Sequence, residues 1–198
     1  MRRCVVVLTA AALVLTIAAP AFAQQRQQAR QQARRPVPDK GMAAVGVSVG
    51  AALPNEPSFA NGFDLAAQVE GYLTPRVSVR GQFSGAWWDI RDHPYTGSVD
   101  PIVLDGNLVY NFEHGVWHPY VTGGVGAYRY HWTEPGVPNG SNTYSGVNLG
   151  GGVEYFFTRD ATLTTEFIFH KVGDVDVARA TLHDGSFWSV TMGGKKYF

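Results

Sequence analysis

The sequence has little cysteine, no excess of charge of either sign and no sustained helical pattern. Its single cysteine, Cys4, lies near the start of the chain, so the remainder can form no disulfide framework and offers no thiol nucleophile. Basic and acidic residues cancel over the whole chain, but residues 41–198 hold nine basic and fifteen acidic residues. We expect no nucleic-acid partner, because an acidic domain lacks the basic face that binds phosphates. Since no segment keeps apolar residues at helical spacing, an all-β fold is predicted.

The first 23 residues have the pattern of a signal peptide. Arg2 and Arg3 precede an apolar run over 4–18 that is short for a membrane span, and residues 21–23 form a small-x-small cleavage site. We therefore predict export through the inner membrane with cleavage after Ala23. No lipoprotein motif precedes Cys4, so lipid attachment is not expected.

A linker and one domain follow the signal peptide 1–23. Residues 24–40 are rich in Gln and Arg, have no apolar face and end near Pro36 and Pro38. This composition cannot bury a core, which predicts a disordered linker. Residues 41–198 are enough for one domain, the predicted barrel.

Eight segments of this domain alternate apolar and polar residues with a period of two. They lie near 42–52, 61–73, 76–89, 101–112, 117–131, 145–157, 160–171 and 186–198. Short connections at 74–75, 113–116 and 158–159 alternate strictly with longer ones at 53–60, 90–100, 132–144 and 172–185. This ordering predicts an eight-stranded antiparallel up-and-down transmembrane β-barrel, with tight turns at one end and loops at the other.

The alternation gives each segment one apolar and one polar face. In the second segment Phe63, Leu65 and Val69 share a face, while Asp64 and Glu70 share the other. Periodicity does not tell which face points inward. The signal peptide and the aromatic residues near the strand ends favour a membrane barrel with its charged face inside.

This orientation predicts two sets of residues. The predicted polar network of the lumen comprises Asp64, Glu70, Arg80, Asp105, Glu154, Glu166 and Lys195. The predicted aromatic residues at the membrane interfaces are Trp87, Trp88, Tyr128, Trp132, Tyr155, Phe157, Tyr197 and Phe198.

The second half of the chain resembles a known family. The segments 119–126 (PYVTGGVG) and 150–155 (GGGVEY), the turn at 158–160 and the strand carrying Glu166 resemble small outer-membrane β-barrel domains of the OmpA/OmpX and opacity type. One departure is Lys196, two residues before the final Phe198, where such proteins usually carry an aromatic or apolar residue.

The resemblance implies a monomer in the bacterial outer membrane of a Gram-negative cell envelope. It implies contacts with outer-membrane lipid and lipopolysaccharide, and recognition of the C-terminal strand ending in Phe198 by the barrel-assembly machinery. We expect a structural or surface-interaction role, with a filled lumen and no wide pore.

Two other functions fit the same pattern. Five acidic and two basic residues in the predicted lumen would give a narrow, porin-like channel a preference for cations. A soluble lipocalin-like barrel would instead turn its apolar face inward to bind an apolar ligand.

Catalysis is not expected. Lipid A deacylase barrels use a His-x-Ser pair, whereas here His170 is followed by Lys171 and Val172. His170 is predicted to be a rim or girdle residue at a strand end. The histidines have no metal-ligand spacing, so we predict no enzyme, no metal site and no cofactor.

Overall fold

The computed structural model describes residues 38–89, 97–112, 115–133, 135–136, 138–177, 180–182 and 184–198. The predicted signal peptide and residues 24–37 of the predicted linker lie outside the described residues, so the domain boundaries remain predictions. The described part of the chain contains no helix that could span a membrane.

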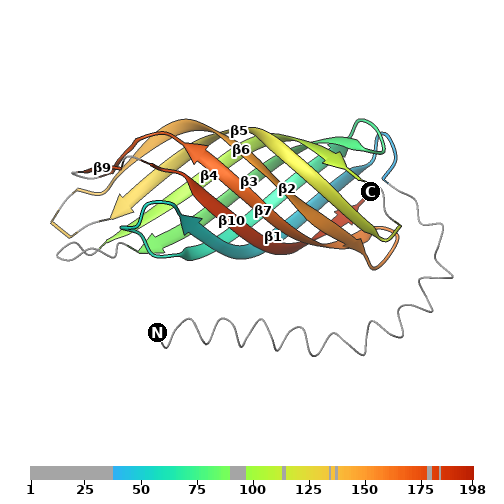
Figure 1. Cartoon of the computed structure of the whole chain (residues 1–198), viewed down its shortest axis with the longest axis horizontal. Coiled ribbons are helices and arrows are strands. Elements are labelled where there is room, and N and C mark those ends of the chain that lie inside the picture. The colour runs from blue at the N-terminus through green and yellow to red at the C-terminus, as the bar shows by residue number, and fades with distance from the viewer. Residues whose placement is uncertain are drawn as a thin grey trace, which may run out of the picture. The chain divides into compact units, whose positions relative to one another are not determined.

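Eight antiparallel strands form a closed barrel in which neighbours in the chain pair with each other and the last strand pairs with the first (Figure 1). The strands are β1 (Ala43–Pro54), β2 (Gly62–Tyr72), β3 (Val77–Asp89), β4 (Ser98–Asn111), β5 (Trp117–Thr133), β6 (Gly140–Phe156), β7 (Ala161–Val172) and β10 (Phe187–Tyr197). The predicted eight-stranded antiparallel barrel is confirmed. At 11 to 17 residues, the strands are long enough to cross a bilayer.

The differences from the predicted strands lie at the end of the barrel that carries the longer connections. There β5 extends to Thr133, past its predicted end at residue 131, and β6 begins at Gly140, before its predicted start at residue 145. The last long connection also contains a short hairpin, β8 (Val175–Val177) and β9 (Ala180–Leu182), which was not predicted. We call the end of the barrel with the longer connections the loop end. The C-terminus lies at the opposite end, the turn end (Figure 1).

Local hydrogen bonds explain the tightness of the turn end. In the connection between β2 and β3, the Thr74 hydroxyl accepts hydrogen bonds from the backbone N–H of Arg76 at 3.2 Å and of Val77 at 2.9 Å. A threonine side chain that bonds nearby backbone amides stabilises a turn. The Thr74–Pro75 sequence therefore reverses the chain within a few residues.

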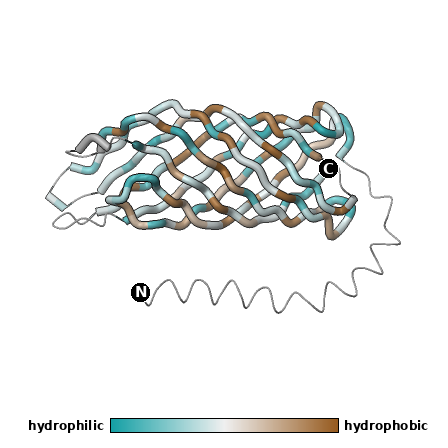
Figure 2. The backbone as a smooth tube through the Cα atoms, viewed as in Figure 1, coloured by the Kyte–Doolittle hydropathy of each residue, from teal (hydrophilic) through white to brown (hydrophobic). Residues whose placement is uncertain are grey.

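The outer wall is apolar, and the charged side chains of the predicted lumen network point inward. Hydropathy alternates along the strands in Figure 2, because successive side chains point to opposite faces. Each barrel strand exposes at least one large apolar side chain near its middle: Val47, Leu65, Phe83, Leu104, Val125, Leu149, Phe167 and Met192. A soluble lipocalin-like barrel would bury these side chains, so that alternative is wrong.

The register of the strands shows that they are tilted, and the number of strands keeps the barrel narrow. Leu53 on β1 pairs with Trp188 on β10, and each next strand continues the row of paired residues. The row passes through Phe169, Leu149, Gly123, Leu108, Val79 and Gly71 and returns to β1 at Ala43, ten residues before Leu53. This offset means that the strands are tilted to the barrel axis. Eight tilted strands leave an interior that side chains can fill.

Gly50 allows a close approach between β1 and β10. A Cβ atom at Gly50 would lie 2.0 Å from the carbonyl oxygen of Val190, whereas one at Gly71 on β2 would meet nothing within 4 Å. We expect Gly50→Ala to lower the free energy of unfolding by about 1–3 kcal/mol through overpacking. Gly71→Ala should change it by less than about 0.5 kcal/mol. Urea unfolding in lipid vesicles, followed by tryptophan fluorescence, measures both, and equal losses would contradict this reading of Gly50.

Candidate functional site

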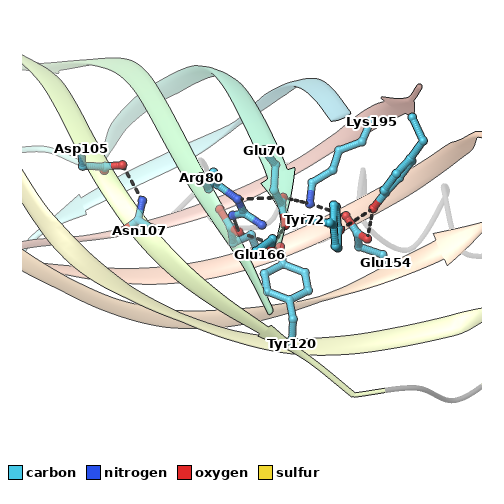
Figure 3. A network of polar contacts seen from close by, with 11 residues as sticks. Glu70, Tyr72, Arg80, Asp105, Asn107, Tyr120, Glu154, Glu166 and Lys195 are labelled. Atoms are coloured by element: carbon cyan, nitrogen blue, oxygen red, sulfur yellow. Dashed lines mark hydrogen bonds and ion pairs between the residues drawn. The ribbon is translucent and has the colours of Figure 1, made fainter. Parts of the chain in front are cut away.

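The interior of the barrel holds all seven residues of the predicted lumen network. Each is buried: Asp64, Glu70, Arg80, Asp105, Glu154, Glu166 and Lys195. Five of them belong to one connected group of ion pairs, which we call the lumen network (Figure 3). Asp64 and Asp105 lie outside it.

Glu70 is the centre of the lumen network. Its Oε2 accepts hydrogen bonds from Arg80 Nε at 3.2 Å and from Lys195 Nζ at 2.7 Å, and its Oε1 accepts one from the Ser78 hydroxyl. Arg80 is directly opposite Glu70 in the pairing of β2 and β3. Lys195 comes from β10 and crosses β1 at Gly46, where a Cβ atom would lie 2.8 Å from the Lys195 side chain. Glycine at position 46 thus leaves room for the lysine.

Arg80 connects two carboxylates from opposite parts of the barrel wall. Its Nη1 donates to Glu166 on β7, which also accepts a 2.6 Å hydrogen bond from the Tyr120 hydroxyl. The Arg80 guanidinium lies 5.1 Å from the centre of the Tyr120 ring, a cation–π distance. Because the Arg80 side chain has no exposed surface, its charge is balanced within the barrel.

Lys195 extends the lumen network toward the turn end. It forms a second ion pair with Glu154 on β6, and Glu154 accepts a 2.6 Å hydrogen bond from the Tyr197 hydroxyl. The hydroxyls of Tyr197 and Tyr72 lie 3.1 Å apart. Polar groups are therefore linked from β3 across the lumen to β10.

Sequence reasoning missed the hydroxyl groups of this network. Ser78 and Tyr120 donate to its carboxylates, and Tyr72 bonds the Tyr197 hydroxyl. All three side chains are buried. Ser78 and Tyr72 share strand parity with Arg80 and Glu70, which is the signal that could have found them. Each of the three carboxylates has at least one of the two cations as a partner, as buried charges require.

Asp64 and Asp105 are buried in the lumen without a basic partner among the described residues. Asp64 accepts a hydrogen bond from the Ser189 hydroxyl at 2.5 Å, and Asp105 accepts one from Asn107 Nδ2 at 2.6 Å. The other oxygen of each carboxylate has no hydrogen-bond partner in the described part of the protein. The structure thus separates the predicted set into a paired network and two isolated acids.

An aromatic and aliphatic cluster fills the lumen at the loop end. It comprises Ala52, Phe59, Ala86, Trp88, Val99, Val103, Tyr128, Tyr130, Val172, Val175 and Phe187. The ring centres of Trp88 and Phe187 are 5.2 Å apart, and the Tyr130 hydroxyl donates to the carbonyl oxygen of Gly185 at 2.5 Å. Val175 belongs to the β8 hairpin, so this hairpin contributes a side chain to the cluster.

His170 lies inside the barrel next to this cluster. Its Nδ1 is 3.0 Å from the Tyr128 hydroxyl, and its ring stacks on Phe187 with the centres 4.5 Å apart. The prediction of a rim or girdle position for His170 is therefore wrong. Even-numbered positions of β7 point inward, and His170 shares this parity with Glu166.

The turn end of the lumen is covered by a smaller aromatic cluster of Ala44, Tyr72, Phe156 and Tyr197. The His118 ring packs against Phe156 with the centres 4.8 Å apart. Apolar clusters thus lie beyond the polar interior at both ends of the barrel.

The eight predicted interface aromatics divide between the two faces of the wall. Trp87, Phe157 and Phe198 are exposed on the outside, and Tyr155 packs on the neighbouring Trp117 with the ring centres 4.7 Å apart.

The predicted interface position is wrong for three aromatics, whose side chains are 0 to 3% exposed inside the barrel: Trp88, Tyr128 and Tyr197. Trp132 is partly buried and packs against the loop-end cluster. The physical reason is strand parity, since an outward Trp87 forces its neighbour Trp88 inward.

Comparison with known proteins relates this geometry to outer membranes. The family model "Outer membrane protein beta-barrel domain" matches residues 9–191. No curated protein matches the sequence.

Solved structures of small barrels have the same fold. Neisserial surface protein A (NspA) matches with a TM-score of 0.62 and 15% identity, covering 80% of this chain and all of its own. OprG from Pseudomonas aeruginosa matches with a TM-score of 0.61 and 11% identity, over 81% of this chain and 97% of its own. Ail from Yersinia pestis matches with a TM-score of 0.56 and 10% identity, over 80% of this chain and 99% of its own. At these identities the likeness concerns the fold alone.

Proposed function

Because the chain belongs to the family of outer membrane protein β-barrel domains, we propose that it is a closed, non-conducting barrel of the bacterial outer membrane that presents its four longer connections at the cell surface. Its role would be structural or interactive. The observation that carries the proposal is the filled lumen, in which ion-paired side chains lie between two apolar clusters.

The lumen network supports a closed interior. Arg80 reaches Glu166 directly from β3 to β7, and Lys195 reaches Glu154 from β10 to β6. Ions crossing the lumen would have to separate these ion pairs and pass the loop-end cluster, which contains Trp88. We therefore favour the closed barrel over the narrow cation-preferring channel.

The proposed role is not enzymatic. His170 occupies the position of the histidine in the His-x-Ser pair of lipid A deacylase barrels. Its Nδ1 contacts the Tyr128 hydroxyl, and its ring is stacked on Phe187. Val172 stands where a deacylase would have its serine. The His-x-Ser pair of lipid A deacylase barrels is therefore missing at positions 170–172.

The family membership supports a proposal for the membrane, the oligomeric state and the assembly of the barrel. We propose a monomer that contacts outer-membrane lipid and lipopolysaccharide and is inserted by the barrel-assembly machinery through β10 and Phe198. Phe198 is 69% exposed, which suits a residue read by another protein. The nearby Lys196 forms an ion pair with Asp160, which offsets its charge. Export with cleavage after Ala23 completes the proposal.

Planar-bilayer recording tests the closed lumen. We expect the purified protein to produce no discrete conductance steps, because the lumen network and the end clusters occupy the cross-section. An open porin added to the same bilayer shows that the assay detects a pore. Steps that depend on cation type would overturn the proposal in favour of the channel, and Asp64 and Asp105 would then be the residues to neutralise.

A further inference from the structure

Two basic residues stand on the outside of the barrel where the apolar wall ends. Arg129 on β5 and Lys171 on β7 are both exposed, and each follows apolar outward positions of its strand, such as Val125 and Phe167. Both lie near the loop end of their strands. This is the level at which an outer-leaflet lipid places its polar head.

A shallow open groove of about 550 Å³ runs along the wall between these two strands. Its lining residues are Val125, Gly126, Ala127, Ser145, Gly146, Val147 and Lys171. Val147 pairs with both Val125 and Lys171, and Arg129 lies two residues beyond Ala127 on the same face. The groove therefore has an apolar floor and basic residues at its loop-end side.

The positive charges of Arg129 and Lys171 are available to bind an anion. Arg129 donates to the Ser141 hydroxyl at 2.8 and 3.1 Å, and it forms no ion pair with a described carboxylate. Lys171 is 56% exposed, and its single described ion pair is a 3.4 Å contact with Asp184. Asp184 also accepts a hydrogen bond from the backbone N–H of Ser186 at 3.0 Å. Exposed ion pairs of this kind are weak and exchange readily with other anions.

We propose that this groove binds a phosphorylated glycolipid of the outer leaflet. An acyl chain would lie on Val125, Ala127 and Val147, and Arg129 and Lys171 would hold phosphate oxygens. Phosphate suits the site because a basic side chain forms charge-assisted hydrogen bonds with it. Two cations separated by β6 favour a lipid with more than one phosphate over a zwitterionic phospholipid. The inference rests on the proposed function, because it gives the proposed contact with lipopolysaccharide a site on a wall that must face lipid.

Lipid retention in native mass spectrometry tests this site. The protein purified from outer membranes is exchanged into phosphatidylcholine nanodiscs with graded amounts of diphosphoryl lipid A and then released into the gas phase. We expect one lipid A to be retained in preference to phosphatidylcholine. Arg129→Gln and Lys171→Gln should each weaken apparent binding about fivefold, since each basic residue near a membrane surface contributes about 1 kcal/mol.

Matched variants make the result specific. Asp184→Asn should strengthen binding about twofold, because it frees Lys171, while Lys196→Gln at the turn end should leave it unchanged. Equal retention of fully dephosphorylated lipid A, or unchanged binding in the Arg129→Gln/Lys171→Gln double variant, would overturn the inference. A failure here would leave the bilayer recordings unaffected, so it is distinguishable from a failure of the closed barrel.

Discussion

Replacing Arg80 by methionine is expected to lower the free energy of unfolding by about 3–5 kcal/mol, the cost of leaving buried charges without their partner. Arg80 has no exposed surface and pairs with both Glu70 and Glu166. Methionine keeps the apolar stem of the arginine side chain but is shorter, so the loss combines the missing charge with a cavity. Equilibrium unfolding in urea, with the protein in phospholipid vesicles, measures the change.

Two further variants separate the charge from the packing at Arg80. Lys196→Gln breaks an ion pair whose two side chains are about half exposed, and it should cost less than about 1 kcal/mol. The triple variant R80M/E70Q/E166Q should recover much of the loss, because it removes the two carboxylates that R80M leaves unpaired. If R80M unfolds at the same urea concentration as the unchanged protein, the lumen network does not stabilise the barrel.

A charge on the outer wall is expected to have the second large effect. Leu104 lies near the middle of β4 and is 62% exposed on the apolar wall. Leu104→Arg should lower the free energy of unfolding in a bilayer by about 2–4 kcal/mol, because arginine at the midplane of a bilayer loses its hydration. Unfolding in vesicles of defined thickness measures this cost.

The matched control places the same residue outside the hydrocarbon. Thr143 is exposed near the loop end of β6, so Thr143→Arg should cost no more than about 1 kcal/mol. Leu104→Arg without a cost above that of Thr143→Arg would contradict a membrane-facing wall at Leu104. The comparison therefore tests the orientation of the barrel independently of its lumen.

The number of strands could be predicted because short local segments of the sequence determine the turns between them. Thr74 and Pro75 form a turn with their own side chains and dihedral preferences, which needs no distant contact. The ends of β5 and β6 could not be placed in this way. Tyr144 and Asn142 in that extension contact Asp176 of the β8 hairpin, thirty-two and thirty-four residues away. Such contacts depend on the closed barrel and leave no local signal.

The members of the lumen network could be predicted, but their pairing could not. Parity alone places Glu70, Arg80 and Glu166 on the polar face. That Arg80 reaches Glu166 on β7 depends on the register around the whole barrel, which periodicity does not contain. The error at Trp88 had a different origin. Clustering of aromatics near the strand ends does not tell which face each one occupies, whereas strict alternation divides the pair Trp87 and Trp88 between the two faces.

The pairing of β1 with β10 has a consequence for how the protein folds. Ala44 pairs with Tyr197, so the last contacts of the barrel join the two most distant parts of the domain. Until β10 is in place, β1 and β7 each keep an unpaired edge, and every free backbone group in hydrocarbon costs several kcal/mol. Intermediates with seven inserted strands are therefore unfavourable, and the high contact order of the final closure makes it slow. Folding kinetics in lipid should thus be governed by the arrival of the C-terminal strand.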